Sequence, residues 1–310
     1  MVLLVAALAI AGYSALAAYA DWHSVRKAVS SISAELVLTV LTLSALNYGL
    51  RYARWRILLH ALGHHVPESR NIAYYLAGFA FTATPGKAGE AVRSVYLLPH
   101  GVTMTESIGT LIMDRLFDLL AIGLLSVFLV VEWRIATAIA VVGCAACGLL
   151  GLPSTRGLGR KVYRATKGLC PACVRVKLHR LSSVHRVINR LGQPRLLVMG
   201  TTLGFAAWLA EGYGLYILVE GLSSTITVAD ALGIYALSIL IGVASFLPGG
   251  LGSTEASMGF LLTRHGLSPD NAIAATVLCR LATLWFAVAL GVLAVLWIAT
   301  RRTPVVAPAP

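Results

Sequence analysis

Charged residues are scarce in this chain of 310 residues. Asp, Glu, Lys and Arg make up 12% of it, whereas 58% is hydrophobic and the mean hydropathy is +0.80. Soluble domains carry about 25% charged residues, so this composition excludes an ordinary soluble globular protein, and its low polarity excludes a disordered chain. The apolar residues fall in blocks of roughly 20 and do not alternate with period two. The sequence therefore predicts an all-α, polytopic membrane protein rather than a β-barrel.

Acidic residues are rarer still, with 13 Asp and Glu against 25 Lys and Arg, which gives a net charge of +12. In a helical membrane protein such an excess collects in cytoplasmic loops, so we do not expect a nucleic-acid partner. Residues 153–195 contain eleven Lys and Arg and no acidic residue. This segment is predicted to be a cytoplasmic loop that faces anionic lipid. Within it, 174–192 fits either a basic amphipathic helix or a disordered linker.

Cysteines are also few, at five. Cys170 and Cys173 form a CxxC motif that His179 and His185 follow, which is suggestive of zinc. The gap from Cys173 to His179 is far shorter than in a zinc finger. No nucleotide-binding G-x-x-x-x-G-K-[ST] motif is present in the sequence. We therefore predict no metal and no cofactor, and any transport by this protein would be passive or coupled to an ion gradient.

The hydrophobic pattern predicts six full spans and two broken segments. The broken segments are 72–98 and 228–264, and each is interrupted by a Pro-Gly turn whose residues are hinge candidates. The spans are 2–20, 33–56, 105–131, 134–152, 196–220 and 270–299, and the hinge residues are Pro85, Gly86, Gly89, Pro248, Gly249, Gly250 and Gly252.

Loop charges predict the topology. Residues 51–70 contain Arg51, Arg54, Arg56 and Arg70, so this segment should be cytoplasmic, as should 153–195. An even number of crossings must then separate the two loops. The broken segment 72–98 therefore enters and leaves on one side, as a re-entrant hairpin. The same parity places both chain termini in the cytoplasm of a bacterial-type inner membrane.

An internal repeat relates the two halves of a single membrane domain, 1–310. At an offset of 165 residues, Glu90 falls on Glu255 and Arg115 falls on Arg280. The repeat units are about 33–131 and 196–299, and three predicted spans separate their equivalent points. An odd number of crossings gives the units opposite orientations, as in many secondary transporters whose sites lie near the midplane. The two broken turns should then face each other across an interior cavity.

Several charged residues fall inside predicted membrane segments, where each costs at least about 2.5 kcal/mol on insertion scales. Glu90–Arg115 and Glu255–Arg280 could be buried ion pairs that hold hairpin to helix. Alternatively, the arginines bind a phosphate, which guanidinium matches with its planar fork. The two interpretations are compatible. The remaining binding candidates are Asp114, Asp118, Arg93, Glu211 and Ser253, the last as a helix N-cap.

The chain resembles the lysylphosphatidylglycerol synthase transmembrane, or flippase-like, family. The resemblance is carried by Arg51–Arg56, by 84–90 with Arg93, by 114–118 and by 247–255, and it covers nearly the whole chain. The family includes the membrane domain of the multiple peptide resistance factor, which is thought to flip aminoacylated phospholipid. Many members have Glu where this chain has Asp114. The aminoacyl-transferase domain of the full synthase is not in the sequence, so we expect no synthesis of the lipid.

The resemblance and the buried charges together predict a lipid translocase, not an enzyme. Its substrate would be a phospholipid or a polyprenyl-linked lipid. A non-catalytic partner subunit of a lipid- or glycan-modifying enzyme is the main alternative, and a lipid-acting enzyme or a small-solute transporter are others. Candidate protein partners are a second copy of the chain and a lipid-biosynthesis enzyme.

Overall fold

Helices make up every regular element that the structure describes. The structure is a computed structural model, which describes residues 32–82, 84–128, 172–222 and 224–301. The all-α prediction is therefore confirmed for these ranges. Two of the predicted spans, 2–20 and 134–152, lie outside the described residues.

Four of the predicted spans coincide with long helices. They are α3 (Ala34–Ala61), α6 (Met104–Ser126), α10 (Pro194–Gly221), and the continuous run of α13 (Pro269–Arg280), η6 (Leu281–Trp285) and α14 (Phe286–Thr300). The first, third and fourth are long and apolar enough to cross a membrane. Helix α6 has 23 residues, or about 35 Å at 1.5 Å per residue, but it carries charges at its centre.

Side-chain caps define where several helices begin. A hydroxyl at the N-cap position accepts a hydrogen bond from a backbone N–H that would otherwise lack a partner in the first turn. At α6 the reciprocal bond from the N-cap backbone to Glu106 completes a capping box. The capping residues are Ser33 of α3, Thr103 of α6, Thr227 of α11 (Val228–Ala244) and Ser268 of α13.

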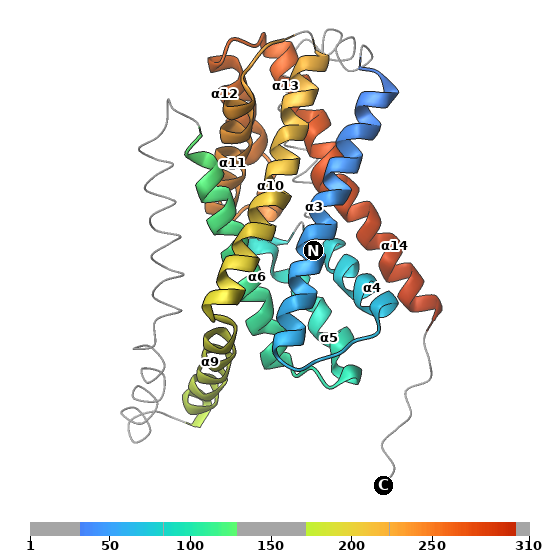
Figure 1. Cartoon of the computed structure of the whole chain (residues 1–310), viewed down its shortest axis with the longest axis vertical. Helices are drawn as coiled ribbons and strands as arrows, with labels where there is room; N and C mark the ends of the chain where they lie inside the picture. The colour runs from blue at the N-terminus through green and yellow to red at the C-terminus, as the bar shows by residue number, and fades with distance from the viewer. Residues whose placement is uncertain (1–31, 83, 129–171, 223, 302–310) are drawn as a thin grey trace.

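Each broken segment forms two helical arms around a Pro-Gly turn. The first consists of α4 (Glu68–Phe79), the 3-10 helix η1 (Pro85–Val92), α5 (Arg93–Leu97) and η2 (Leu98–His100). The second consists of α11 (Val228–Ala244), η5 (Pro248–Gly250) and α12 (Ser253–Arg264). Helices α4 and α5 lie in the lower half of Figure 1, whereas α11 and α12 lie in its upper half. The two breaks meet between them, where η1 contacts η5.

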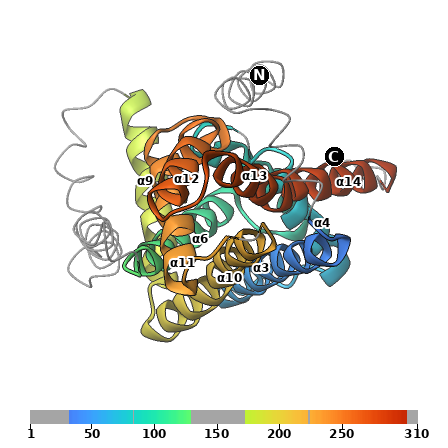
Figure 2. The same cartoon turned by 90° about the horizontal axis from the view of Figure 1, so that it is seen from above.

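Helix packing holds the contact between η1 and η5 in place. Helices α3 and α10 lie side by side along much of their length (Figures 1 and 2), and α10 also packs against α6 and α11. Helix α14 projects to one side and covers α4. Helix α9 (Ala172–Leu191) occupies the position of the predicted amphipathic helix, so the linker alternative is excluded there. Its residues Val187, Ile188 and Leu191 are buried in a cluster with side chains of α3 and α6.

Candidate functional site

Helix α6 brings two carboxylates into the middle of the bundle. Asp114 and Asp118 are spaced one turn apart, so they share a helix face. Their exposed fractions are only 0% and 4%. A carboxylate without compensation would be very costly at such a place, and both have cationic partners from another helix.

Those partners are Arg51 and Arg54 of α3, which are buried as well. The Arg54 guanidinium lies 2.6 Å from Oδ1 of Asp114 and 2.6 Å from Oδ1 of Asp118. Arg51 lies 3.1 Å from Oδ2 of Asp118. The interpretation of Arg51 and Arg54 as cytoplasmic loop charges is therefore wrong, because α3 continues through them and their charge is neutralised inside the protein. Of the segment 51–70, Arg56 and Arg70 keep side chains that reach solvent.

Arg115 joins this cluster to the first break. Its guanidinium lies 2.8 Å from Oδ2 of Asp114, 3.2 Å from Oδ2 of Asp118 and 3.4 Å from Oε2 of Glu90. The predicted ion pair between Glu90 and Arg115 is thus present, at the longest of these distances. The Arg115 side chain is 23% exposed, whereas those of the other buried arginines in the network are at most 6% exposed. Arg115 is therefore the arginine that is most accessible to a ligand.

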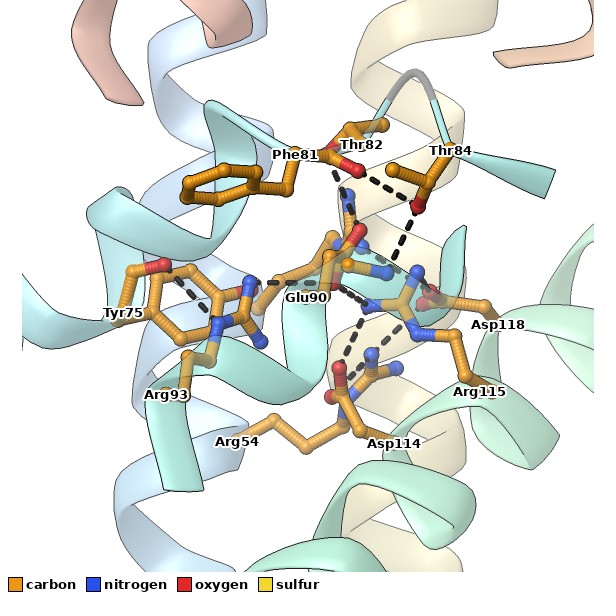
Figure 3. A network of polar contacts seen from close by, with 12 residues as sticks. Arg54, Tyr75, Phe81, Thr82, Thr84, Glu90, Arg93, Asp114, Arg115 and Asp118 are labelled. Atoms are coloured by element: carbon orange, nitrogen blue, oxygen red, sulfur yellow. Dashed lines mark hydrogen bonds and ion pairs between the residues drawn. The ribbon is translucent and has the colours of Figure 1, made fainter. Parts of the chain in front are cut away.

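Glu90 lies between two arginines, as Figure 3 shows, with Arg115 on one side and Arg93 on the other. Its second oxygen accepts a hydrogen bond from the Thr82 hydroxyl at 3.1 Å. Arg93 stacks on the Tyr75 ring at 4.2 Å and donates Nε to the Tyr75 carbonyl. A Cβ at Gly78 would lie 2.2 Å from the Arg93 Nε, so only glycine leaves room for this side chain. These contacts hold the Arg93 side chain within the packed interior.

The second break has its own ion pair. Arg280 Nε lies 2.7 Å from Oε1 of Glu255, and another guanidinium nitrogen donates to the Gly249 carbonyl at 2.8 Å. The predicted pair Glu255–Arg280 is therefore present. The backbone N–H of Gly252 donates to Oε2 of Glu255 at 2.7 Å. Gly252 is the N-cap of α12, so the prediction that Ser253 is the cap is wrong. Ser253 is the first helical residue, and its hydroxyl donates to the Gly250 carbonyl.

Glu211 of α10 occupies a smaller polar space beside these groups. The Tyr235 hydroxyl of α11 donates to it. Glu211 lines a cavity of about 50 Å³ together with Arg51, Glu90 and Arg280. A π-helical segment, η6, directly follows Arg280, and its Thr283 carbonyl accepts a hydrogen bond from Tyr48 of α3. Such π segments often occur at functional positions in helices.

A larger cavity of about 270 Å³ lies between the two breaks. Thr84 from the first break and Gly249 and Gly250 from the second lie on its wall. Among the described residues, the charged ones on this wall are Arg115, Asp118 and Arg280, so two arginines that are distant in the sequence share one space. The remaining wall is mainly apolar, from Leu119, Ile122, Trp208, Ile239, Val243, Phe246, Leu247 and Leu284.

Among the described residues, no group of three or more His, Cys, Asp and Glu could hold a metal ion. Cys170 lies outside the described residues, and only the backbone of Cys173 and His179 is described, so the possible pairing of these cysteines with His179 or His185 stays open. Of the hinge candidates, Pro85 and Gly86 open η1, and Gly89 lies within it. Gly249, Gly250 and Gly252 all have positive φ, at 63°, 67° and 87°.

Comparison with known proteins identifies a family of membrane proteins. Residues 3–291 match the family described as the lysylphosphatidylglycerol synthase TM region, and the chain belongs to that family of membrane proteins. A UPF0104 membrane protein of Methanothermobacter thermautotrophicus is 27% identical, with 84% of each chain covered. One from Methanocaldococcus jannaschii is 25% identical, over 91% of this chain and 90% of the relative. A third, from Pyrococcus horikoshii, is 23% identical over 78% and 81%.

Sequence reasoning missed Arg51, Arg54 and Trp208 as members of the site. Trp208 of α10 donates its indole N–H to Oδ1 of Asp118 at 3.0 Å. The spacing of Arg51 and Arg54 was the available signal, because two arginines one turn apart complement two carboxylates one turn apart. A lone tryptophan in an apolar helix offers no such signal.

Proposed function

We propose that this chain is a lipid translocase that moves a phospholipid or polyprenyl-linked lipid between the two leaflets. The observation that carries the proposal is that Arg115 and Arg280 lie on the wall of one mainly apolar cavity. Arg115 contacts Glu90 at the first break, and Arg280 contacts Glu255 at the second. Such a wall suits an amphiphile, because guanidinium binds phosphate and the apolar remainder contacts hydrocarbon. The family description names the membrane region of a lipid synthase, which agrees with a lipid ligand.

Glu90 and Glu255 would keep the two arginines in place when no lipid is bound. Each carboxylate pairs with its arginine and also accepts a hydrogen bond from its own break, through Thr82 or the Gly252 backbone. A phosphate can replace the carboxylate as partner of the arginine, since two of its oxygens can accept the two parallel N–H groups of a guanidinium. Exchange between these two partners would link lipid binding to movement of the breaks.

The placement of the two breaks supports transport by alternating access. The first broken segment lies in one half of the molecule and the second in the other, and η1 contacts η5 at the centre. We propose that both are re-entrant hairpins and that the two units are an inverted repeat. Non-helical backbone at membrane depth is tolerated where it lines such a cavity. In transporters of this type, rocking of one unit against the other exposes a central site to each side in turn.

Leaflet exchange in proteoliposomes tests the proposal. Headgroup-labelled phosphatidylglycerol would be measured with the wild type, with Arg115→Ala/Arg280→Ala, and with Arg70→Ala/Arg264→Ala as a control that removes two exposed arginines. We expect exchange above empty vesicles for the wild type and the control, and exchange at the level of empty vesicles for the cavity variant. Size-exclusion profiles must match for all three proteins. Equal exchange by folded wild type and folded cavity variant would contradict the site, and no exchange with any tested phospholipid would contradict the function.

A further inference from the structure

The charged groups on the wall of the main cavity are not equally available to a ligand. Among the described residues, Asp118 is the one carboxylate on this wall, and both of its oxygens already have partners. Oδ1 lies 2.6 Å from Arg54 and 3.0 Å from the Trp208 indole nitrogen. Oδ2 lies 3.1 Å from Arg51 and 3.2 Å from Arg115. A ligand ammonium group that approached Asp118 would have to displace an arginine and would meet its positive charge.

The neighbouring carboxylates offer no better acceptor. Asp114 lies between Arg54 and Arg115, and Glu255 divides its two oxygens between Arg280 and the Gly252 N–H. Glu90 pairs with Arg93 and Arg115. The described part of the cavity wall thus has two guanidinium groups and one carboxylate, and the Arg115 side chain is 23% exposed against 6% for Asp118. Burial in a low-dielectric interior strengthens both the attraction for anions and the repulsion of cations.

The opposite part of the wall is hydrophobic and reaches the outer surface of the bundle. Phe246 is 75% exposed, and Val243 and Leu247 are also exposed. Phe246 has φ 54°, and among the described residues it is the one non-glycine with positive φ. Bulky side chains rarely adopt this conformation, which is sparsely populated and often occurs at functional positions. Its aromatic ring lies on the cavity wall and is largely exposed, which places it at the rim.

On the basis of the proposed function, we infer that this cavity selects lipids with an anionic phosphate headgroup that carries no ammonium group. The phosphate lies against Arg115 and Arg280, and the acyl chain leaves past Val243, Phe246 and Leu247. Zwitterionic and aminoacylated headgroups are disfavoured, because the one carboxylate on the described part of the wall, Asp118, is already paired with three arginines. A volume of about 270 Å³ also favours a small headgroup, since it lies just below the ~300–1,000 Å³ of typical ligand pockets.

Equilibrium binding of lipids with identical acyl chains tests this selectivity. Phosphatidylglycerol, phosphatidylethanolamine and lysylphosphatidylglycerol would each displace labelled phosphatidylglycerol from the full chain in detergent. We expect phosphatidylglycerol to bind at least about tenfold more tightly than either lipid with an ammonium group, the effect of one well-placed charge pair. Phosphatidylethanolamine separates the effect of charge from that of headgroup size. Equal or tighter binding of either ammonium lipid would overturn the inference.

A charge placed on the wall provides a second test that does not depend on removing an arginine. Leu119 of α6 is partly buried and lines the cavity. In Leu119→Glu the new carboxylate supplies the missing acceptor, so the preference for phosphatidylglycerol over lysylphosphatidylglycerol should fall by about tenfold. Leu119→Gln has nearly the same shape without the charge and should keep the wild-type preference. Identical preferences in the two variants would contradict the electrostatic explanation.

The binding tests can fail independently of the transport test. If phosphatidylglycerol is preferred but no leaflet exchange occurs, the selectivity stands and the translocase proposal falls. If all three lipids exchange at the same rate and bind with the same affinity, the translocase proposal stands and the selectivity falls.

Discussion

The first break and the second are surrounded by different kinds of interaction. At the first, side chains form a network in which Asp118 contacts three arginines and Glu90 contacts two. At the second, Glu255 has a single arginine partner, and three glycines with positive φ shape the turn. The comparison suggests that the first region is a shared electrostatic structure, whereas the second combines one ion pair with special backbone geometry.

Such a difference has consequences for how each region could move. Breaking one ion pair in a network leaves the other ion pairs in place, but it changes the electrostatic energy of every remaining charge. At the second break, opening involves the Glu255–Arg280 ion pair and the hydrogen bonds of these residues with Gly252 and Gly249. We therefore expect the Glu255–Arg280 side to be the more readily opened, with the first region serving as its support.

Removing Asp118 should have the largest effect of the changes considered. Asp118→Ala leaves Arg51, Arg54 and Arg115 with a net excess of buried positive charge. Loss of one partner from a buried ion pair costs about 3–5 kcal/mol, and three affected arginines place this variant at the upper end. We expect a sharply lower melting temperature in detergent, or no folded protein at all.

Glu35→Ala is the matched control for Asp118→Ala, because Glu35 is an exposed acid in the first turn of α3. An exposed substitution of this kind should change stability by less than about 0.5 kcal/mol. If both variants melted at the wild-type temperature, the network around Asp118 would contribute nothing to stability, and the contrast between the two breaks would disappear.

Much of this architecture follows from the sequence, and the limits have a physical origin. Pro-Gly turns and the pairs Glu90–Arg115 and Glu255–Arg280 could be predicted, since proline and glycine act locally and the repeat aligns the charged residues. The buried role of Arg51 and Arg54 could not be read from local pattern, because arginines at a helix end usually mark a cytoplasmic loop. Their neutralising partners are on a different helix, distant in the sequence.

The N-cap of α12 shows the same limit of sequence-based prediction within a single helical turn. Serine before an acidic residue is a typical N-cap signal, but Gly252 adopts a conformation with φ 87° and takes the cap position itself. The carboxylate of Glu255 then accepts the Gly252 N–H. Backbone conformations that only glycine favours thus shift a helix start by one residue, which a residue-type rule does not detect.

Variants that neutralise both members of an ion pair should distinguish the energetics of the two regions. At the second break, Glu255→Gln or Arg280→Met alone leaves a buried charge and should cost about 3 kcal/mol. The double variant carries neither charge, and Gln still offers an oxygen to the Gly252 N–H. We therefore expect the double variant to cost no more than either single variant, which corresponds to a coupling free energy of at least about 3 kcal/mol. Thermal unfolding of the four proteins in detergent measures this cycle.

The equivalent cycle at the first break, Glu90→Gln with Arg115→Met, should show little recovery. Arg93 also depends on Glu90, and Asp114 and Asp118 also depend on Arg115. Removing both members therefore leaves other charges without a partner, and the two costs should be closer to additive. Equal coupling in the two cycles would mean that the first region is not a network in the energetic sense.

The smallest expected effect comes from the backbone at the second break. Gly252 has φ 87° and ψ −55°, and nothing lies within 4 Å of the position where a Cβ would be. Gly252→Ala therefore tests conformation without a steric clash, and it keeps the N–H that Glu255 accepts. A strained conformation of this kind costs about 1–3 kcal/mol for a residue with a side chain.

Gly49→Ala is the matched substitution on the side of the first region. Gly49 lies inside α3, and a Cβ there would also have nothing within 4 Å. Because alanine is the better helix former, this variant should gain about 0.5–1 kcal/mol rather than lose stability. Opposite shifts in melting temperature are thus expected from the same chemical change at two open positions. A Gly252→Ala protein as stable as Gly49→Ala would mean that the turn relaxes freely, and the second region would then owe its shape to the Glu255–Arg280 pair rather than to its glycines.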